Sequence, residues 1–227
     1  ILLKQIKNIN RIIIIDIDEA ELKKIKIEIK NSYPYITSQI IVSDFSKKIT
    51  ISSMFQRNET PVIFFPGSTI GNFDITEINQ FLKMTHECIG GKGYFLVSVD
   101  LKKDRKIIEG AYNDRAGITA EFNKNVLNRI NSELSGDFDL NYFKHVAFYD
   151  DIKGRIEMYL ESLKLQTVRI GNNNFDFKKG ERIQTEYSYK FSISEFQNIV
   201  RRSNFMPLKF WTDPNKFFAV HLLKTLL

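Results

Sequence analysis

The stretch Phe64-Phe65-Pro66-Gly67-Ser68-Thr69-Ile70-Gly71-Asn72-Phe73 decides which fold this chain adopts. Its first residues complete an apolar run that begins at Pro61 and is short enough to be a buried strand. Pro66-Gly67 ends that strand, and two nearby glycines let the backbone approach a ligand closely. Polar side chains follow at the carboxyl end of the strand, where open α/β sheets bind ligands: Ser68, Thr69 and Asn72. An ordinary strand-to-helix turn with a Ser or Thr N-cap is the alternative.

The composition is that of an ordinary globular protein. The 227 residues are 43% apolar and 26% charged, which excludes disordered and fibrous classes and allows one large or two small domains. The net charge is +6, but no basic stripe interleaves with aromatic residues, so we expect no nucleic-acid partner. Cys88 is the sole cysteine, and the three histidines lack ligand spacing, so we expect no disulfide and no metal.

No apolar run approaches the roughly 20 residues of a membrane span, and no signal peptide is visible. We therefore expect a cytoplasmic protein without a membrane partner, and a monomer. The chain opens at Ile1 without Met, inside what resembles a helix, and we expect it to be part of a longer protein.

Two further apolar runs predict parallel strands that end in an acid. Four isoleucines within Arg11–Asp16 predict a strand buried on both faces. In nucleotide-binding α/β folds an acid at the position of Asp16 accepts hydrogen bonds from ribose hydroxyls. Capping of the predicted helix 19–33 by Asp16 or Asp18 is the alternative, and both roles are compatible. The strand 40–42 leads into Asp44 and Phe45, an acid beside an aromatic ring that can hold a purine; a plain turn is the alternative.

Alternating strands and helices predict a doubly wound parallel sheet. Residues 74–88 form the next predicted helix and 94–100 the next strand. A polar helical region and antiparallel strands follow, and a terminal hairpin of 208–212 and 217–223 then adds to the sheet edge, as in class I methyltransferases. The expected fold class is α/β, a Rossmann-like sheet with an inserted α+β substrate-binding domain. The expected boundaries are 1–104 for the core, 105–190 for the insert and 191–227 for the return to the core.

One strand of the insert carries a candidate binding face. Its period of two places Glu186 and Ser188 on one face and Thr185, Tyr187 and Tyr189 on the other. A carboxylate and a hydroxyl side by side can grip a small polar ring. An exposed strand face is the alternative.

Several motifs together resemble the histidine-specific, S-adenosylmethionine-dependent N-methyltransferases, which make hercynine for ergothioneine biosynthesis. The resemblance rests, in order, on 65–73, 100–104, 111–114 (Ala-Tyr-Asn-Asp), 117–120, 122–125, 156–158, 180–181, 185–188 (Thr-Glu-Tyr-Ser) and 211–214 (Trp-Thr-Asp-Pro). The order and the rough spacing hold over nearly the whole chain.

The resemblance implies a role for each candidate. For the cofactor S-adenosylmethionine, Asp16 would hold the ribose, Asp44 and Phe45 would bracket the adenine, and Gly67 and Thr69 would line the cleft. For the substrate L-histidine, Asn72 and Tyr112, the expected catalytic residues, would bind the amine and the carboxylate, Glu186 and Ser188 the imidazole, and Met158 would pack beside it. Relatives that act on other amino acids look different at the Met158 and Glu186 positions, so this pair favours histidine.

The sequence departs from the family pattern at its start. The family's Gly-rich cofactor loop, and N-terminal helical residues that complete the substrate pocket, belong before Ile1. We expect the 227-residue chain as written to lack the central strand and to be inactive, and the full-length protein to be active. The alternatives are a methyltransferase for another amino acid or amine, and a non-catalytic module that binds amino acids or nucleosides.

Overall fold

The computed structural model describes residues 2–6, 8–56 and 58–226. Its elements are α1 (Leu2–Gln5), β1 (Arg11–Asp16), α2 (Glu19–Ser32), β2 (Thr37–Val42), η1 (Ser52–Met54), β3 (Val62–Phe65), η2 (Thr69–Asn72), α3 (Ile75–Cys88), β4 (Tyr94–Asp100), α4 (Arg105–Tyr112), α5 (Ile118–Leu134), η3 (Leu140–Tyr142), β5 (Phe143–Asp150), β6 (Arg155–Ser162), β7 (Gln166–Ile170), β8 (Asn173–Phe177), β9 (Arg182–Tyr189), α6 (Ile193–Arg202), β10 (Phe205–Thr212) and β11 (Phe218–Thr225), where η marks a 3₁₀ turn. None of these helices is long and apolar enough to cross a membrane.

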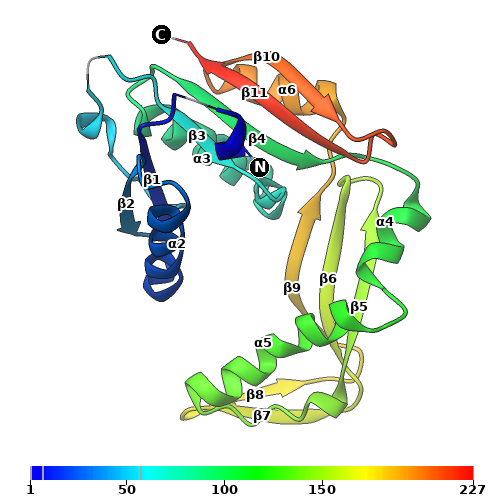
Figure 1. Cartoon of the computed structure of the whole chain (residues 1–227). Helices are drawn as coiled ribbons and strands as arrows, with labels where there is room; N and C mark the ends of the chain where they lie inside the picture. Colours follow the sequence, from blue (N-terminus) through cyan, green and yellow to red (C-terminus); the bar gives the residue numbers. More distant parts are fainter. Residues whose placement is uncertain (1, 7, 57, 227) are drawn as a thin grey trace.

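The first strands form a parallel pair, β1 with β2, with helix α2 beside them (Figure 1). Helix α2 begins after Asp18, whose carboxylate accepts a hydrogen bond from the Glu21 amide, as the capping alternative expected. The predicted burial of β1 on both faces is wrong, because its isoleucines are only half-buried. Within the described residues β1 pairs with β2 alone, so neighbouring strands do not enclose it.

A second, four-stranded sheet has the order β10-β11-β4-β3. Strands β3 and β4 are parallel, and the terminal hairpin β10–β11 joins β4 antiparallel, which confirms the predicted hairpin at the sheet edge. Helices α3 and α6 pack on one face, where Phe95, Val97 and Val99 are fully buried. The structure thus confirms the α/β class, with a mixed sheet.

The buried strand predicted after Pro61 is only half correct. In β3, Ile63 and Phe65 pack into the core, whereas Val62 and Phe64 are 58% and 54% exposed. Successive side chains of a strand point to opposite faces, and α3 and α6 both pack on the face of Ile63. The apolar run therefore reflects only one buried face.

Between α4 and β9 the chain leaves this sheet and forms a second α+β unit (Figure 1). Strands β5, β6 and β9 make an antiparallel sheet, and β7 and β8 a separate hairpin. Helix α4 packs against β5 and β6 around Ile108, Ile156 and Met158, while α5 covers the far end around Leu127 and Phe143. The insert therefore has two small cores of its own.

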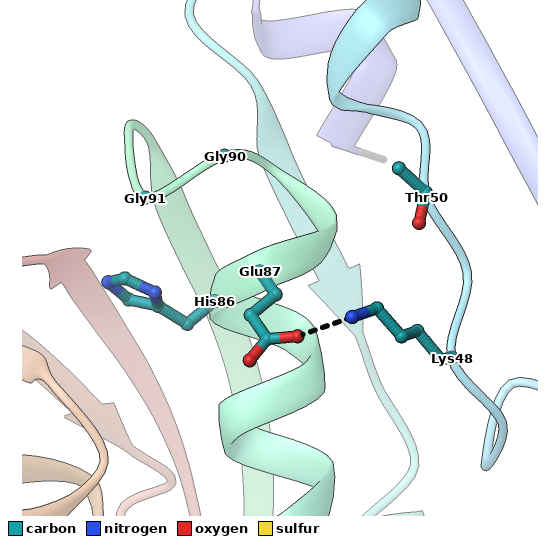
Figure 2. Close-up of a pocket in the computed structure, with 6 residues that line it drawn as sticks. All are labelled: Lys48, Thr50, His86, Glu87, Gly90 and Gly91. Atoms are coloured by element: carbon teal, nitrogen blue, oxygen red, sulfur yellow. Dashed lines mark ion pairs between the residues drawn. The ribbon is translucent and has the colours of Figure 1, made fainter.

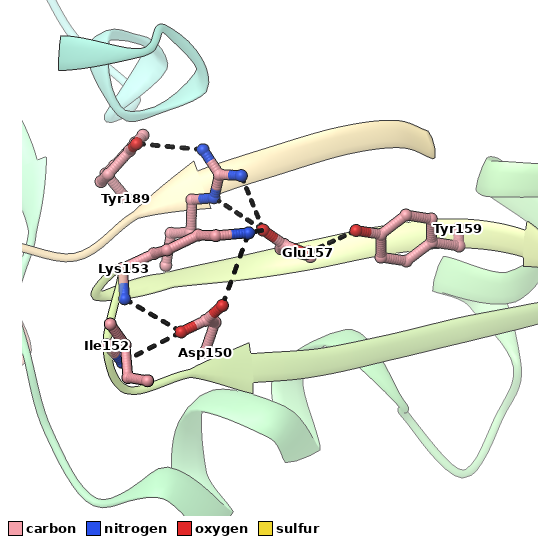
Figure 3. A network of polar contacts seen from close by, with 7 residues as sticks. Asp150, Ile152, Lys153, Glu157, Tyr159 and Tyr189 are labelled. Carbon is pink, nitrogen blue, oxygen red and sulfur yellow. Dashed lines mark hydrogen bonds and ion pairs between the residues drawn. The ribbon is translucent and has the colours of Figure 1, made fainter. Parts of the chain in front are cut away.

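A buried carboxylate, Glu157, organises one face of the insert sheet (Figure 3). It is 3% exposed and accepts hydrogen bonds from Lys153 (2.7 Å), Arg155 (2.6 Å) and the Tyr159 hydroxyl. Burial alone would raise its pKa, but these donors outweigh burial and hold the pKa at about 2. Arg155 also donates to the Tyr189 hydroxyl at 3.0 Å, and Tyr189 packs on the main core. The network thus connects the insert to the sheet.

His221 on β11 is a buried titratable side chain. It is fully buried between the rings of Phe196 and Phe210, with centroids 5.0 and 5.9 Å away. Neither of its ring nitrogens has a hydrogen-bond partner among the described residues. Burial lowers its pKa from 6.5 to about 4. Between these two pH values the ring is mostly neutral in the folded protein, whereas an unfolded histidine is mostly charged.

His221 should therefore destabilise the fold in mild acid. Below pH 6.5 the unfolded chain takes up a proton that the folded ring refuses, so stability falls as the pH drops towards 4. Between pH 7.5 and pH 5 this group should remove about 2 kcal/mol of unfolding free energy, and His221→Phe should abolish that component. Urea unfolding at both pH values measures it. Any packing cost of the Phe ring is the same at both, so an equal pH dependence in variant and wild type would contradict the prediction.

Candidate functional site

The loop after β3 is tied to the end of β4 through Ser68. Gly67 and Ser68 have left-handed backbone, with φ of 81° and 60°. The Ser68 hydroxyl accepts a hydrogen bond from the Asp100 amide at 2.8 Å, and the Ser68 amide donates to Ser98 Oγ at 3.3 Å. Helix α3 instead starts after Asp74, which forms a reciprocal capping box with Glu77. The alternative, a turn in which a Ser or Thr caps the next helix, is therefore wrong, because Asp74 caps α3.

Gly71 brings the same loop against β9 of the insert. A Cβ at Gly71 would lie 2.9 Å from the Tyr189 carbonyl oxygen and 3.7 Å from Ser188 Oγ. Only a residue without a side chain fits at that distance. Asn72 is exposed and directly follows this glycine in the chain.

The face predicted for β9 is confirmed in its geometry. Met158 lies directly opposite Glu186, and Ile156 opposite Ser188, with a bulge at Thr185. Met158 is 2% exposed and Ser188 is 5% exposed, so this is no exposed strand face. Burial raises the pKa of the Glu186 carboxyl, and the positive charge of Lys190 offsets part of this increase. Among the described residues the Glu186 carboxylate has no hydrogen-bond or ion-pair partner, so it is available to a ligand.

The sequence analysis missed Lys190, the charged centre of this cluster. Its side chain is 1% exposed and lies 3.0 Å from Asp100 Oδ2. It also donates to Tyr112 Oη at 3.0 Å and to Ser188 Oγ at 2.8 Å. The period of two that joins Glu186 to Ser188 continues to Lys190, so the pattern held the signal, but a lysine one step beyond the motif was given no role.

The backbone of Tyr112 is held in place at the end of α4 by His145, which is half-buried, and through it by the buried Asn123. The Tyr112 carbonyl accepts a hydrogen bond from His145 Nε2 at 2.9 Å, so that nitrogen carries the proton. The other ring nitrogen then accepts from Asn123 Nδ2 at 2.9 Å, and Asn123 also donates to the Tyr159 carbonyl. Because Asn123 is 3% exposed, this chain of hydrogen bonds fixes the end of α4 against the insert sheet.

The predicted cofactor residues lie at the carboxyl ends of three strands. Asp16 ends β1 and accepts from the Asp18 amide, and Asp44 follows β2 and accepts from Ser46, which lowers its pKa. Phe45 packs edge-on against Phe65 of β3 and Phe73 after the loop, with centroids 5.4 and 6.4 Å away. These contacts bring the β1–β2 pair to the loop that holds Gly67 and Thr69.

The candidates therefore fall into two groups. The first is one contact network around Lys190 and consists of Tyr112, Met158, Glu186 and Ser188. Asn72 follows Gly71, the residue that packs against β9 beside Ser188. The second consists of Asp16, Asp44 and Phe45 on the β1–β2 pair, with Gly67 and Thr69 on the loop. The ring of Phe45 contacts the ring of Phe73, which directly follows Asn72 in the chain.

The surface hollow in Figure 2 lies elsewhere. It lies at the end of α3 and is lined by Lys48, Thr50, His86, Glu87, Gly90 and Gly91, with an ion pair of 3.1 Å between Lys48 and Glu87. The Gly90-Gly91 turn precedes β4, so the hollow lies at the amino-terminal edge of the sheet, opposite Asp100. It holds none of the candidates. The described part of the chain contains no group of three or more His, Cys, Asp or Glu side chains arranged for a metal ion.

Comparison with known proteins gives a consistent set of relatives. A family profile described as "Histidine-specific methyltransferase, SAM-dependent" matches residues 1–225. A histidine N-alpha-methyltransferase of Mycolicibacterium smegmatis is 34% identical over 216 residues, which are 94% of this chain and 66% of that protein. The ergothioneine biosynthesis protein 1 of Schizosaccharomyces pombe is 28% identical over 84% of this chain and 25% of its own length.

Among solved structures, an S-adenosylmethionine-dependent methyltransferase from Clostridium acetobutylicum has a TM-score of 0.49 at 10% identity, covering 95% of this chain and 75% of that one. The chain thus spans slightly less than two thirds of the mycobacterial relative and a quarter of the fission-yeast one.

The fit of Gly71 against β9 can be tested by adding one methyl group. Gly71→Ala should lower the free energy of unfolding by about 1–3 kcal/mol, because the new Cβ meets a backbone oxygen that cannot move aside freely. Gly110→Ala is the matched control: nothing lies within 4 Å of its added Cβ, so it should stabilise helix α4 by roughly 0.5–1 kcal/mol. Urea unfolding compares the two, and equal midpoints would show that the loop does not pack on β9.

Proposed function

This chain belongs to the family of histidine-specific, S-adenosylmethionine-dependent methyltransferases, and we propose that the protein methylates the α-amino group of L-histidine. The product would be N,N,N-trimethylhistidine (hercynine), and the pathway ergothioneine biosynthesis. The names of the bacterial and fungal relatives support both assignments.

The observation that carries this proposal is the Glu186 carboxylate, which has no partner among the described residues and lies beside Ser188 and opposite Met158. A carboxylate accepts hydrogen bonds, and a hydroxyl can donate one, so together they match a ring with one N–H and one bare nitrogen. The apolar side chain of Met158 would pack on the ring between them. An apolar amino acid would leave both polar groups without partners, which costs roughly a few kcal/mol and so favours histidine.

The other two residues would hold the amino-acid head group. We assign Tyr112 to the carboxylate, since its hydroxyl lies at the end of a fixed helix beside the charge of Lys190. We assign Asn72 to the amine, because its side-chain oxygen can accept an amine hydrogen and orient the nitrogen lone pair. Both side chains would contact the substrate, which makes them the proposed catalytic residues.

The residues at the carboxyl ends of β1–β3 fit the cofactor. The Asp16 carboxylate would accept from the ribose hydroxyls, and Asp44 from the adenine amine beside the Phe45 ring, while Gly67 and Thr69 would line the cleft. The carboxylates of Asp16 and Asp44 are exposed and half-buried, respectively, so a ligand can reach them. Both are acceptors, which suits the hydroxyl and amine donors of the cofactor. When bound, S-adenosylmethionine supplies an electrophilic methyl group on a positively charged sulfur.

The protein's contribution would then be orientation and exclusion of water. The substrate amine must lose a proton before it can act as a nucleophile, and Asn72 would hold it in line with the methyl group. The two imidazole nitrogens are competing nucleophiles. Glu186 and Ser188 would keep them away from the methyl group, so the same contacts would give both affinity and the choice of nitrogen.

We propose residues 105–190 as the substrate-binding domain and residues 1–104 with 191–227 as the cofactor-binding core. The separate hydrophobic cores of the insert support this division. We further propose a cytoplasmic monomer. The single cysteine, Cys88, is buried and unpaired, which suits a reducing compartment.

A methylation assay with a mixture of all amino acids tests the function. The protein in its natural full length is incubated with S-adenosylmethionine and the mixture, and the products are read by mass spectrometry. A gain of three methyl groups on histidine alone is expected. Methylation of another amine would keep the chemistry but refute the assignment of Met158 and Glu186, and binding without any methylation would support a non-catalytic module.

Glu186→Gln tests the imidazole contact. The amide keeps the shape but accepts a weaker hydrogen bond, so the KM for histidine should rise about 10- to 100-fold while the KM for S-adenosylmethionine stays the same. Glu161→Gln on the neighbouring strand is the control, since Glu161 pairs with Lys144 and Arg182 outside the site. Because burial raises the Glu186 pKa, the variant should also be no less stable than wild type at neutral pH. An unchanged histidine KM would refute the role.

A further inference from the structure

The Lys190 ammonium group contacts three different elements, through one ion pair and two hydrogen bonds. The group has three N–H donors and no acceptor. Its three partners are Asp100 Oδ2 at the end of β4, Tyr112 Oη at the end of α4 and Ser188 Oγ on β9. The side chain is 1% exposed, so water does not compete for these bonds.

This arrangement determines which way two hydroxyl protons point. Each hydroxyl has a single proton, and a hydroxyl that accepts from Lys190 must direct its own proton elsewhere. Tyr112 and Ser188 both accept from Lys190, so both present an O–H donor away from it. They are also the two hydroxyls that the proposed function assigns to the substrate carboxylate and the imidazole. The Tyr112 hydroxyl could then donate to a substrate carboxylate oxygen, and the Ser188 hydroxyl to the bare ring nitrogen, because both of these are acceptors.

The structure does not need Lys190 to neutralise Asp100. Lys103 also contacts the Asp100 carboxylate, at 2.5 Å, and is itself only 14% exposed. The strand junction has further ties, because the Phe191 amide donates to the Asp100 carbonyl and the Lys102 amide to the Phe191 carbonyl. The contacts that belong to Lys190 alone are those to the two hydroxyls.

We propose that Lys190 is a positioning residue that holds Tyr112 and Ser188 as hydrogen-bond donors towards the amino-acid substrate. The proposal rests on the proposed function, since it takes the substrate to be histidine. Lys190 does not touch the substrate and acts through the two hydroxyls. The titratable and charged groups that face it are Asp100, Lys103, Tyr112 and Glu186.

Lys190→Met in the full-length protein tests the proposal, since Met keeps an unbranched apolar stem and removes the three donors. The Kd for histidine should rise about 10- to 100-fold, because two substrate-facing hydroxyls lose their fixed direction, while the Kd for S-adenosylmethionine stays within about twofold. Ser188→Ala should weaken histidine binding less in the Lys190→Met background than in wild type, because the two residues act as one unit.

Lys103→Met is the matched control, since it removes the other lysine on Asp100 and touches neither hydroxyl. It should bind histidine as wild type does. If Lys190→Met fails to fold, Asp100→Asn with Lys190→Met removes both charges and should show the same selective loss of histidine affinity.

A wild-type histidine Kd in the Lys190 variant would overturn the proposal. So would an equal loss of affinity for both ligands, or the same loss in Lys103→Met, since each would indicate a general structural role. Failure of the proposed function is separate and appears in the unmodified protein, which would then methylate no histidine.

Discussion

The structure depends on the junction at the carboxyl end of β4, where a buried ion pair and a short parallel bridge join the insert to the sheet. Lys190 pairs with Asp100, and Leu101 pairs with Phe191. Burying two charges removes them from water, so such a pair adds little net stability compared with apolar packing. Removing Asp100 would leave the buried Lys190 ammonium without a counter-ion, whereas Asp100 without Lys190 would still pair with Lys103. The pair therefore favours one relative placement of the segments that carry Asp100 and Lys190.

Strand β9 uses its two faces for two different purposes. One face bears Glu186, Ser188 and Lys190, which form the candidate substrate site. The other bears Tyr187 and Tyr189, whose rings lie 4.4 and 5.2 Å from the Arg155 guanidinium carbon. Because alternate side chains point to opposite faces, the joint to the core and the site are built on one strand and on Lys190, the residue that directly follows it. Any shift of β9 in its register would disturb both at once.

Local patterns predicted the elements well because their causes are local. The predicted bounds of β1 and β4 agree with the structure, and the helix predicted over residues 74–88 is α3, which begins after Asp74 with a capping box. An apolar run or a cap acts through neighbours in sequence, so it can be recognised without a fold. The shared face of Glu186 and Ser188 followed from the period of two in the same way.

Burial and the pairing of polar side chains could not be predicted in this way, because residues far apart in the sequence decide them. The isoleucines of β1 and the outward side chains of β3 are more exposed than their apolar runs indicated, since what covers a strand is not written in the strand. Lys190 resembles any surface lysine until Asp100, Tyr112 and Ser188 are brought around it. The sequence by itself determined the strands, the caps and the chemistry available on each face. Only the tertiary structure decided which charges leave water, because desolvation depends on neighbours that folding supplies.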